Sequence, residues 1–306
     1  MALRIGFIGL GIMGSRMAAN LRAHNYELVV FNRTADKAAE LLRSGARWGR
    51  SPAAVAAEAD VLFTMLPHPE AVSAAALGGT GFLAALRPGS IWASCGTVNP
   101  SFARRMEEVS AERRVRYLDA PVTGSKDAAA HADLTFLVGG DAVDLEVCRP
   151  LFECMGKRII HVGGPGLGSA LKMVNNLLGA LSMAAFAEGA ALGQALGVPR
   201  QIMFDSLIGG PMVAPMMAMK RAKIERHDYD PDFSLQWIQK DLHLASISAY
   251  EAGVAMPVAN VAKEIYRLAM RAGYADQDFS ALYAFVNQPS AADEQPHARE
   301  LIREAR

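Results

Sequence analysis

The glycines at positions 9, 11 and 14 have the spacing of a phosphate-binding turn. They follow an apolar run that begins at Arg4, and residues 15–23 after them have a helical pattern. In this setting Gly9 allows a tight turn, Gly11 lets the backbone approach a pyrophosphate, and Gly14 permits close packing of helix on strand. N–H groups at the start of the helix would then bind phosphate oxygens. The pattern predicts a dinucleotide site at Gly9, Gly11, Ile12, Met13 and Gly14.

The end of the next apolar run, at residues 32–34, indicates which dinucleotide is bound. An NAD enzyme usually has a carboxylate here, about twenty residues after the glycine turn, which accepts from the ribose 2′-hydroxyl and would repel a 2′-phosphate. Asn32 removes that repulsion. Arg33 can pair with a phosphate and lie against adenine, and Thr34 offers a hydroxyl at a helix N-terminus. We therefore expect NADPH as the cofactor in preference to NADH.

Short apolar strands alternate with helices up to about residue 164, which is typical of a parallel sheet covered on both faces. Thr34 is expected to cap a helix over Ala35–Ser44, and Ser51 followed by Pro52 is expected to begin another. The strand near Thr135 predicts a variation at the sheet edge whose direction the sequence leaves open. The predicted strands are Arg4–Gly9, Glu27–Asn32, Asp60–Met65, Ser90–Ser94, Arg116–Ala120, Thr135–Gly139 and Arg158–Val162.

The pattern after residue 164 is helical. A long helix is expected over 168–196, followed by helices over 199–208, 215–225, 234–251 and 258–271. We predict an α/β protein with a Rossmann-type, doubly wound NADP-binding domain over 1–164 and an all-α substrate and oligomerisation domain over 165–287, joined by the long interdomain helix. Residues 288–306, with Pro289, Pro296 and mixed charges, are expected to form a peripheral, partly disordered tail.

The composition limits the classes of partner. The 306 residues include 31 basic and 31 acidic side chains, so no overall field attracts nucleic acid or an anionic membrane. The apolar stretch Leu177–Leu196 is interrupted by Glu188 and Gln194 and is interpreted as a buried helix, not a membrane span. The 3 cysteines form neither a disulfide framework nor a metal-binding spacing, and no signal-peptide pattern precedes the first strand. We expect a cytoplasmic protein without a metal.

Motifs placed in order along the chain closely resemble the β-hydroxyacid dehydrogenase family, which is related to 3-hydroxyisobutyrate dehydrogenase. The resemblance covers nearly the whole chain up to the tail. Asn32-Arg33-Thr34 and Gly124-Ser125-Lys126 look most like the glyoxylate and succinic semialdehyde reductases, whereas Ser94-Cys95-Gly96 departs from the usual pattern. The motifs are GFIGLGIMGSRMAANL at 6–21, DAPVTGS at 119–125, GLGSALKMVNN at 166–176 and QKDLHLA at 239–245.

The resemblance implies that Lys172 is the catalytic lysine. Hydride reduction of an aldehyde leaves developing negative charge on oxygen, which needs a positioned proton donor. Lys172 lies near the start of the long predicted helix, where the positive helix dipole and an oxidised nicotinamide would both disfavour an ammonium, so we expect a lowered pKa. Asn176 lies one turn later on the same face and would orient the lysine or hold substrate.

The remaining site residues are also assigned by resemblance. Family substrates carry a carboxylate, which the backbone and hydroxyl groups of Thr123-Gly124-Ser125 could bind. The family commonly has serine where Thr123 stands, and the added methyl narrows the expected pocket. By resemblance Phe233 walls that pocket and Asp241 holds the active-site network. The loops beside the cofactor are expected to contribute Leu66, Pro67, Thr97 and Lys240.

We therefore expect NADPH-dependent reduction of a small carboxylated aldehyde, such as glyoxylate or succinic semialdehyde, to the hydroxy acid. A 3-hydroxyisobutyrate or tartronate semialdehyde type of dehydrogenase remains an alternative with the same lysine. A non-enzymatic alternative is an NADP-binding oligomeric sensor or scaffold, which would be expected to lack Lys172 or Asn176. Ala/Gly/Met-rich helices over 177–196 and 212–220 favour a homodimer or homotetramer.

Overall fold

The computed structural model describes residues 3–287 and divides the chain into two compact units. The first unit comprises Met1–Leu177 together with Lys240–Met256, and the second comprises Leu178–Gln239 together with Pro257–Arg306. The predicted tail over 288–306 lies outside the described residues.

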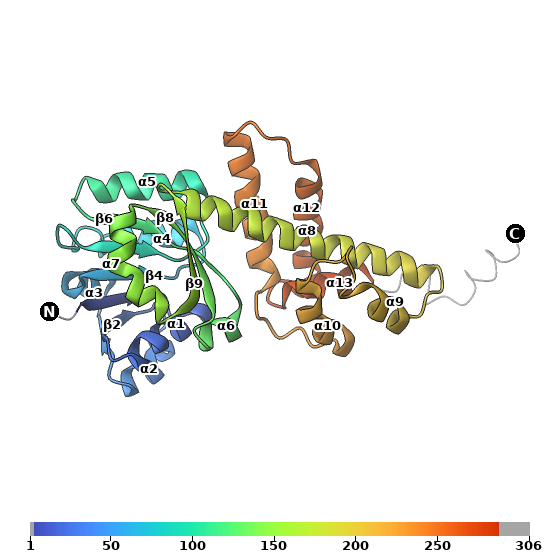
Figure 1. Ribbon diagram of the computed structural model, residues 1–306, viewed down its shortest axis with the longest axis horizontal. Coiled ribbons are helices and arrows are strands. Elements are labelled where there is room, and N and C mark those ends of the chain that lie inside the picture. Colours follow the sequence, from blue (N-terminus) through green and yellow to red (C-terminus); the bar gives the residue numbers. More distant parts are fainter. Residues whose placement is uncertain (1–2, 288–306) are drawn as a thin grey trace, which may run out of the picture. The chain divides into compact units, whose positions relative to one another are not determined.

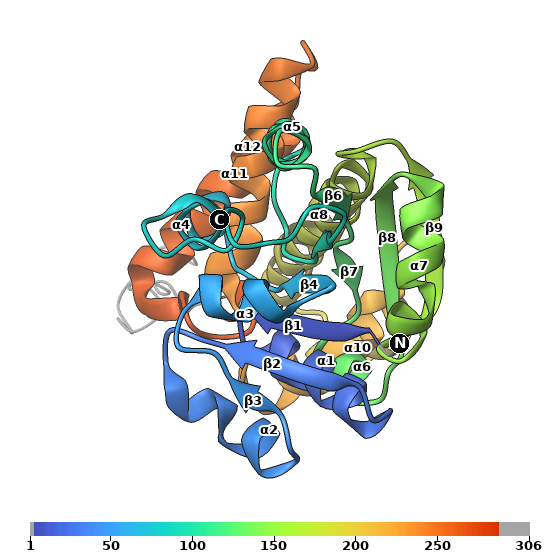
Figure 2. The same cartoon turned by 90° about the vertical axis from the view of Figure 1, so that its left-hand side faces the viewer.

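A 9-stranded sheet forms the centre of the first unit, in the order β3-β2-β1-β4-β5-β6-β8-β7, with β9 paired to β8. Figure 2 shows β3, β2, β1 and β4 following one another in that order. The strands from β3 to β6 are parallel, whereas β8 runs antiparallel to β6 and to β7. The bounds are β1 Arg4–Ile8, β2 Glu27–Phe31, β3 Arg47–Trp48, β4 Val61–Thr64, β5 Ile91–Ser94, β6 Arg116–Asp119, β7 Val122–Thr123, β8 Leu134–Gly140 and β9 Gly156–Gly163.

Helices cover both faces of this sheet (Figure 1). Apolar residues of α1, α2, α6 and α7 pack in one buried cluster, and those of α3, α4 and α5 pack in another on the opposite face. Because both faces are covered, the central strands β4 and β5 are buried throughout and mostly apolar, as the sequence predicts. The bounds are α1 Ile12–Ala23, α2 Ala39–Arg43, α3 Pro52–Glu58, α4 Pro69–Leu77, α5 Pro100–Ala111, α6 Lys126–Ala130 and α7 Ala142–Glu153.

All the predicted strands are present, with ends that differ by at most two residues. The sheet is not parallel throughout, because β8 and β9 run in the direction opposite to β6 at its edge. Ser51 caps α3 by accepting from the Ala54 N–H at 3.1 Å, as predicted. The prediction at Thr34 was wrong in detail: a 3-10 turn over Ala35–Ala38 precedes α2, and the Thr34 side chain makes no capping hydrogen bond.

The second unit is helical. The helices α8 and α11 each contribute residues to both units. The bounds are α8 Leu167–Ala195, α9 Arg200–Leu207, α10 Met216–Arg226, α11 Leu235–Glu251, α12 Pro257–Ala269 and α13 Leu282–Val286, with a π turn over Met270–Tyr274 and a 3-10 turn over Phe279–Ala281.

The apolar segment 177–196 is helical as expected, but only one of its faces is buried. Ala180, Met183 and Ala187 are fully buried, whereas Leu178 and Leu192 remain 59% and 61% exposed. The prediction of a buried helix is therefore wrong for the second face. By length and composition α8 is long and apolar enough to cross a membrane. The core helices of water-soluble proteins can have the same length and composition, so this is weak evidence for a membrane span.

Candidate functional site

The glycine turn joins β1 to α1 and has the geometry that phosphate binding requires. A Cβ on Gly9 would lie 2.3 Å from the Met65 carbonyl oxygen, and Gly9 has a φ of +99° that favours glycine. A Cβ on Gly14 would lie 1.9 Å from the Gly9 carbonyl oxygen. A Cβ on Gly11, in contrast, would meet nothing within 4 Å. Gly11 therefore leaves open space in front of the first turn of α1, whose N–H groups have no acceptor within the helix.

Asn32 at the end of β2 holds this turn in place. Its Oδ1 accepts from the Leu10 N–H at 3.0 Å, and its Nδ2 donates to the Thr34 carbonyl at 2.9 Å. Arg33 is exposed and has no hydrogen bond or ion pair within residues 3–287. The Arg33 guanidinium and the Thr34 hydroxyl can therefore both bind a ligand, while Asn32 orders the backbone that carries them. The residues thus fit an adenosine 2′-phosphate.

Lys240 ties together the two loops that follow β4 and β5. Its ammonium donates to the Pro67 carbonyl at 2.7 Å and to the Thr97 carbonyl at 3.1 Å. The loops are also close to each other, because a Cβ on Gly96 would lie 2.2 Å from the Leu66 carbonyl oxygen. This contact explains a glycine that the sequence marked only as a departure from the family pattern. Both loops follow the carboxyl ends of parallel strands, the edge at which open α/β sheets bind ligands.

A hydrogen-bonded network connects α11 to α8 within the first unit. The Asn176 side chain donates to Asp241 Oδ2 at 2.5 Å, and both residues are buried. Asp241 Oδ1 lies 2.8 Å from the Lys240 ammonium and forms an ion pair with it, but accepts no hydrogen bond from the described residues. Asp241 thus joins Asn176 to the lysine that ties the loops.

Lys172 lies one turn before Asn176 and interacts electrostatically with the same groups. Burial lowers the pKa of its amine to about 8, the Asp241 carboxylate opposes this shift, and the Lys240 ammonium adds to it. The direction agrees with the expectation from sequence, but burial is the main cause. No hydrogen bond or ion pair joins the Lys172 ammonium to another residue of the part of the chain that the structure describes. A half-buried amine of this kind can exchange a proton near neutral pH.

The start of α8 is bound to the sheet by a residue that the sequence did not single out. Asp119, the last residue of β6, is fully buried and accepts from the Gly166 N–H at 2.8 Å and from the Ser169 N–H at 2.6 Å. Its carboxylate therefore caps the helix that carries Lys172 and offsets the positive end of the helix dipole.

The remaining predicted residues lie in two places. Thr123 ends β7, Gly124 has a φ of +116°, and Ser125 precedes α6 without a side-chain cap. The two hydroxyls of this segment have no hydrogen-bond partner within residues 3–287, so they can bind a ligand. Phe233 belongs to the second unit, where its ring lies 6.1 Å from that of Phe279.

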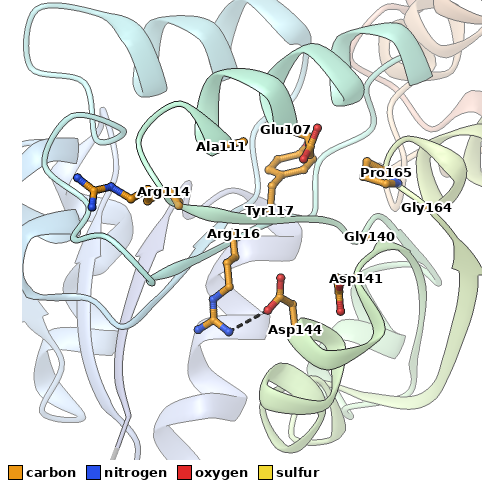
Figure 3. Close-up of a pocket in the computed structure, with 11 residues that line it drawn as sticks. Glu107, Ala111, Arg114, Arg116, Tyr117, Gly140, Asp141, Asp144, Gly164 and Pro165 are labelled. Carbon is orange, nitrogen blue, oxygen red and sulfur yellow. Dashed lines mark hydrogen bonds and ion pairs between the residues drawn. The ribbon is translucent and has the colours of Figure 1, made fainter.

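A hollow of about 620 Å³ lies elsewhere in the first unit and contains none of the predicted site residues (Figure 3). It opens between α5, the beginning of β6 and α7, and Arg116 forms an ion pair across it with Asp144 at 2.8 Å. The hollow lies at the amino end of β6, whereas the glycine turn and the loops bound by Lys240 follow the carboxyl ends of their strands. The chemistry-bearing residues, and not this hollow, define the candidate site.

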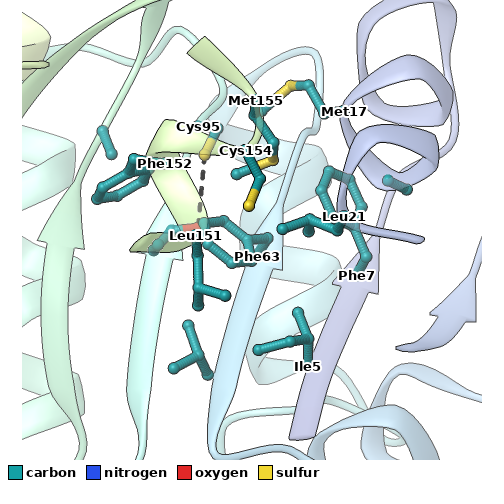
Figure 4. Packing of buried hydrophobic residues seen from close by; sticks show 14 of the residues in the cluster. Ile5, Phe7, Met17, Leu21, Phe63, Cys95, Leu151, Phe152, Cys154 and Met155 are labelled. Carbon is teal, nitrogen blue, oxygen red and sulfur yellow. Dashed lines mark hydrogen bonds between the residues drawn. The ribbon is translucent and has the colours of Figure 1, made fainter. Parts of the chain in front are cut away.

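Cys95 lies next to the Thr97 loop but belongs to the core. Figure 4 shows it among apolar side chains that include Phe63 and Phe152. Burial raises the pKa of its thiol far above the ordinary value. A buried thiol of this kind is not a nucleophile.

Two known protein families together match nearly all of the described chain. Residues 4–163 match the family of the NAD-binding domain of 6-phosphogluconate dehydrogenase. Residues 166–286 match the family described as NAD-binding of NADP-dependent 3-hydroxyisobutyrate dehydrogenase. A solved structure of Mycobacterium tuberculosis 3-hydroxyisobutyrate dehydrogenase with L-serine has a TM-score of 0.85 and 34% identity, covering 94% of this chain and 100% of that one.

Curated relatives carry names that describe different functions. NAD-dependent L-serine dehydrogenase of Pseudomonas aeruginosa is 38% identical over 287 residues, which cover 91% of this chain and 96% of that protein. Glyoxylate/succinic semialdehyde reductase 2 of Arabidopsis thaliana is 35% identical over 278 residues, covering 91% and 78%. The human cytokine-like nuclear factor N-PAC is 34% identical over 280 residues, which are 92% of this chain but only 51% of that protein.

Proposed function

Since the chain belongs to the β-hydroxyacid dehydrogenase family and is an NAD(P)-dependent oxidoreductase acting on CH–OH groups, we propose that it reduces a small carboxylated aldehyde with NADPH. Glyoxylate and succinic semialdehyde are the proposed substrates, and the hydroxy acid is the product. The observation that carries the proposal is the network of Asn176, Asp241 and Lys240, which contacts the loops at the carboxyl edge of the sheet and acts electrostatically on the half-buried amine of Lys172.

In the proposed reaction Lys172 Nζ donates a proton to the aldehyde oxygen as negative charge develops there. Bound NADPH supplies the hydride. Asn176, held by Asp241, keeps the substrate oxygen beside the lysine. The free hydroxyls of Thr123 and Ser125 bind the substrate carboxylate. This division of roles separates binding of the carboxylate from chemistry at the aldehyde.

A second candidate is a dehydrogenase of the 3-hydroxyisobutyrate or tartronate semialdehyde type that oxidises a β-hydroxy acid. The relatives named for L-serine and NAD favour it. Steady-state kinetics with glyoxylate, succinic semialdehyde and methylmalonate semialdehyde in one direction, and L-serine in the other, test both. A kcat/KM for glyoxylate or succinic semialdehyde at least tenfold above the others supports the reductase. A preference for L-serine with NAD would replace it with the second candidate.

Arg33 provides the test of coenzyme choice. A hydrogen bond between charged groups contributes about 1.5–3 kcal/mol, so Arg33→Ala should raise the KM for NADPH about 10- to 100-fold while the KM for NADH changes less than about twofold. Arg43→Ala is the matched control, because Arg43 is an exposed arginine at the end of α2. Equal losses with both coenzymes, or a wild-type preference for NADH, would contradict the assignment.

The pH dependence should report Lys172. Reduction needs the ammonium, so its rate should be constant at low pH and fall above about pH 8, where the amine loses its proton. The rate of oxidation of the hydroxy acid should rise through the same pH.

Because Asp241 raises the pKa of Lys172, Asp241→Asn should move the midpoint of the pH–rate profile to lower pH. The pH–rate profiles of wild type and Asp241→Asn should be measured beside that of Asp144→Asn. This control removes a carboxylate that is paired with Arg116 and lies outside the network. A profile that Asp241→Asn leaves in place would argue against Lys172.

We also propose that the protein is a homo-oligomer. Leu178 and Leu192 lie on the exposed face of α8, Leu196 follows directly after its end, and all three leave apolar surface in contact with water. A second copy of the same chain would cover it. Sedimentation equilibrium measures the mass directly, and a monomer at micromolar concentration would refute the proposal.

A further inference from the structure

We propose that Asp119 is a positioning residue for Lys172: its carboxylate binds the first turn of α8 to the end of β6 and so keeps the lysine in its half-buried place. This inference rests on the proposed role of Lys172 only for its catalytic consequence. The structural part concerns the helix and its lysine alone, so the two can be tested separately.

The contact is short, buried and double. Both carboxylate oxygens of Asp119 are used, one by the Gly166 N–H at 2.8 Å and the other by the Ser169 N–H at 2.6 Å. Asp119 is 0% exposed, so water does not replace either bond. Hydrogen bonds from backbone N–H groups to a carboxylate are among the stronger ones in proteins. Residues 166 and 169 are therefore fixed to a strand about fifty positions earlier in the chain.

Glycines permit this approach. A Cβ on Gly139 of β8 would lie 2.4 Å from Asp119 Oδ1 and 2.8 Å from the Gly168 nitrogen. A Cβ on Gly168 would lie 2.3 Å from the Leu137 carbonyl oxygen. The helix start thus packs directly on the backbone of two strands, and any side chain at either glycine would push it away.

Lys172 is three residues beyond Ser169, nearly one turn along the same helix. No hydrogen bond or ion pair with another residue of 3–287 holds its ammonium, so its burial depends on where the helix backbone lies. The charged groups that act on it are Asp241 and Lys240, both on α11. If the first turn of α8 moves from the sheet, water reaches the amine and its pKa rises toward the ordinary value of 10.5.

The test uses Asp119→Asn, which keeps the size of the side chain but replaces one acceptor oxygen by a donor that faces an N–H group. Gly139→Ala is a second variant, because it displaces the same contact and leaves the carboxylate in place. Asp144→Asn is the matched control, since it removes another buried carboxylate of the first unit that does not touch α8. The full-length variants are compared with wild type, without coenzyme, at equal fractions folded.

The direct readout is the titration of Lys172. Reductive methylation with formaldehyde and cyanoborohydride proceeds through the neutral amine, and peptide mass spectrometry gives its rate at Lys172 as a function of pH. We expect a midpoint near 8 in wild type and Asp144→Asn, and a midpoint displaced toward 10.5 in Asp119→Asn and Gly139→Ala. We also expect kcat to fall about 10- to 100-fold in those two variants, as for a small misplacement of a reacting group, with coenzyme Kd changed less than about twofold.

Midpoints that stay near 8 in both variants would overturn the inference, and so would an equal displacement in Asp144→Asn. Failure of the proposed function has a different signature. If Lys172→Ala turns over like wild type, the lysine is not the proton donor, whereas a displaced midpoint in Asp119→Asn would still establish what holds it.

Discussion

Replacement of Lys172 by alanine should lower kcat for aldehyde reduction by about 10²- to 10⁴-fold, the range expected when a general acid is lost. The KM for substrate should change much less, because Asn176 and the hydroxyls of Thr123 and Ser125 remain to bind it. Coenzyme binding, measured by NADPH fluorescence, should stay within about twofold, since Lys172 is not part of the glycine turn. The remaining rate of the variant should be nearly independent of pH between 6 and 9, because no other amine replaces the donor, so the loss relative to wild type should be largest below about pH 8.

Two variants sharpen this measurement. Lys172→Arg keeps the positive charge but removes a group that can release a proton near pH 8, so it should be as slow as the alanine variant. Lys157→Ala is the matched control, because Lys157 is an 80% exposed lysine paired with Asp133. Turnover of Lys172→Ala within fivefold of wild type would contradict the proposed mechanism.

The largest effect on stability should come from the second unit. Lys220 is buried between Asp278 at 2.8 Å and Asp232 at 3.1 Å, and its ammonium lies 5.1 Å from the centre of the Phe279 ring. Removing one partner of a buried ion pair leaves an uncompensated charge and costs about 3–5 kcal/mol. Lys220→Met should therefore lower the free energy of unfolding by about that amount, measured by urea titration monitored by circular dichroism.

Two further variants identify the cause. Lys223→Met removes a neighbouring lysine whose ion pair with Asp232 is longer, at 3.6 Å, and should cost less than Lys220→Met. Adding Asp278→Asn to Lys220→Met should recover part of the loss, because the buried charge is then gone. A double variant that is less stable than Lys220→Met would show that the cost comes from lost packing instead.

Much of the first unit follows from local sequence. The strands that the sequence predicts are apolar and rich in β-branched or aromatic residues, and the glycine turn has the conformation that its spacing indicates. The strands that escaped prediction, β3 and β7, have only two residues each. Two residues are too few to show the alternation of apolar and polar side chains that indicates a strand. The reversal of β8 was not predictable either, because direction depends on pairing with distant strands.

Motifs indicated the candidate site residues, but not the contacts that hold them. Lys172, Asn176, Lys240 and Asp241 were identified through motifs. The structure joins Asn176, Asp241 and Lys240 in one network that acts electrostatically on Lys172, and their roles stay predictions. Asp119 was missed as a helix cap because its donors lie about fifty residues later in the chain. Asn20 was missed likewise: it donates to the Ala129 carbonyl at 2.7 Å and ties the helix after the glycine turn to α6.

The two bonds of Asn32 limit how this enzyme could be converted from one coenzyme to the other by engineering. An aspartate at position 32 would still accept from the Leu10 N–H, but it could not donate to the Thr34 carbonyl. The exchange that a designer would try first thus loosens the turn before the 3-10 segment at Ala35. The proposed selectivity for a coenzyme and the order of the turn at residues 32–34 thus depend on the same residue. A successful redesign would need a new donor for the Thr34 carbonyl.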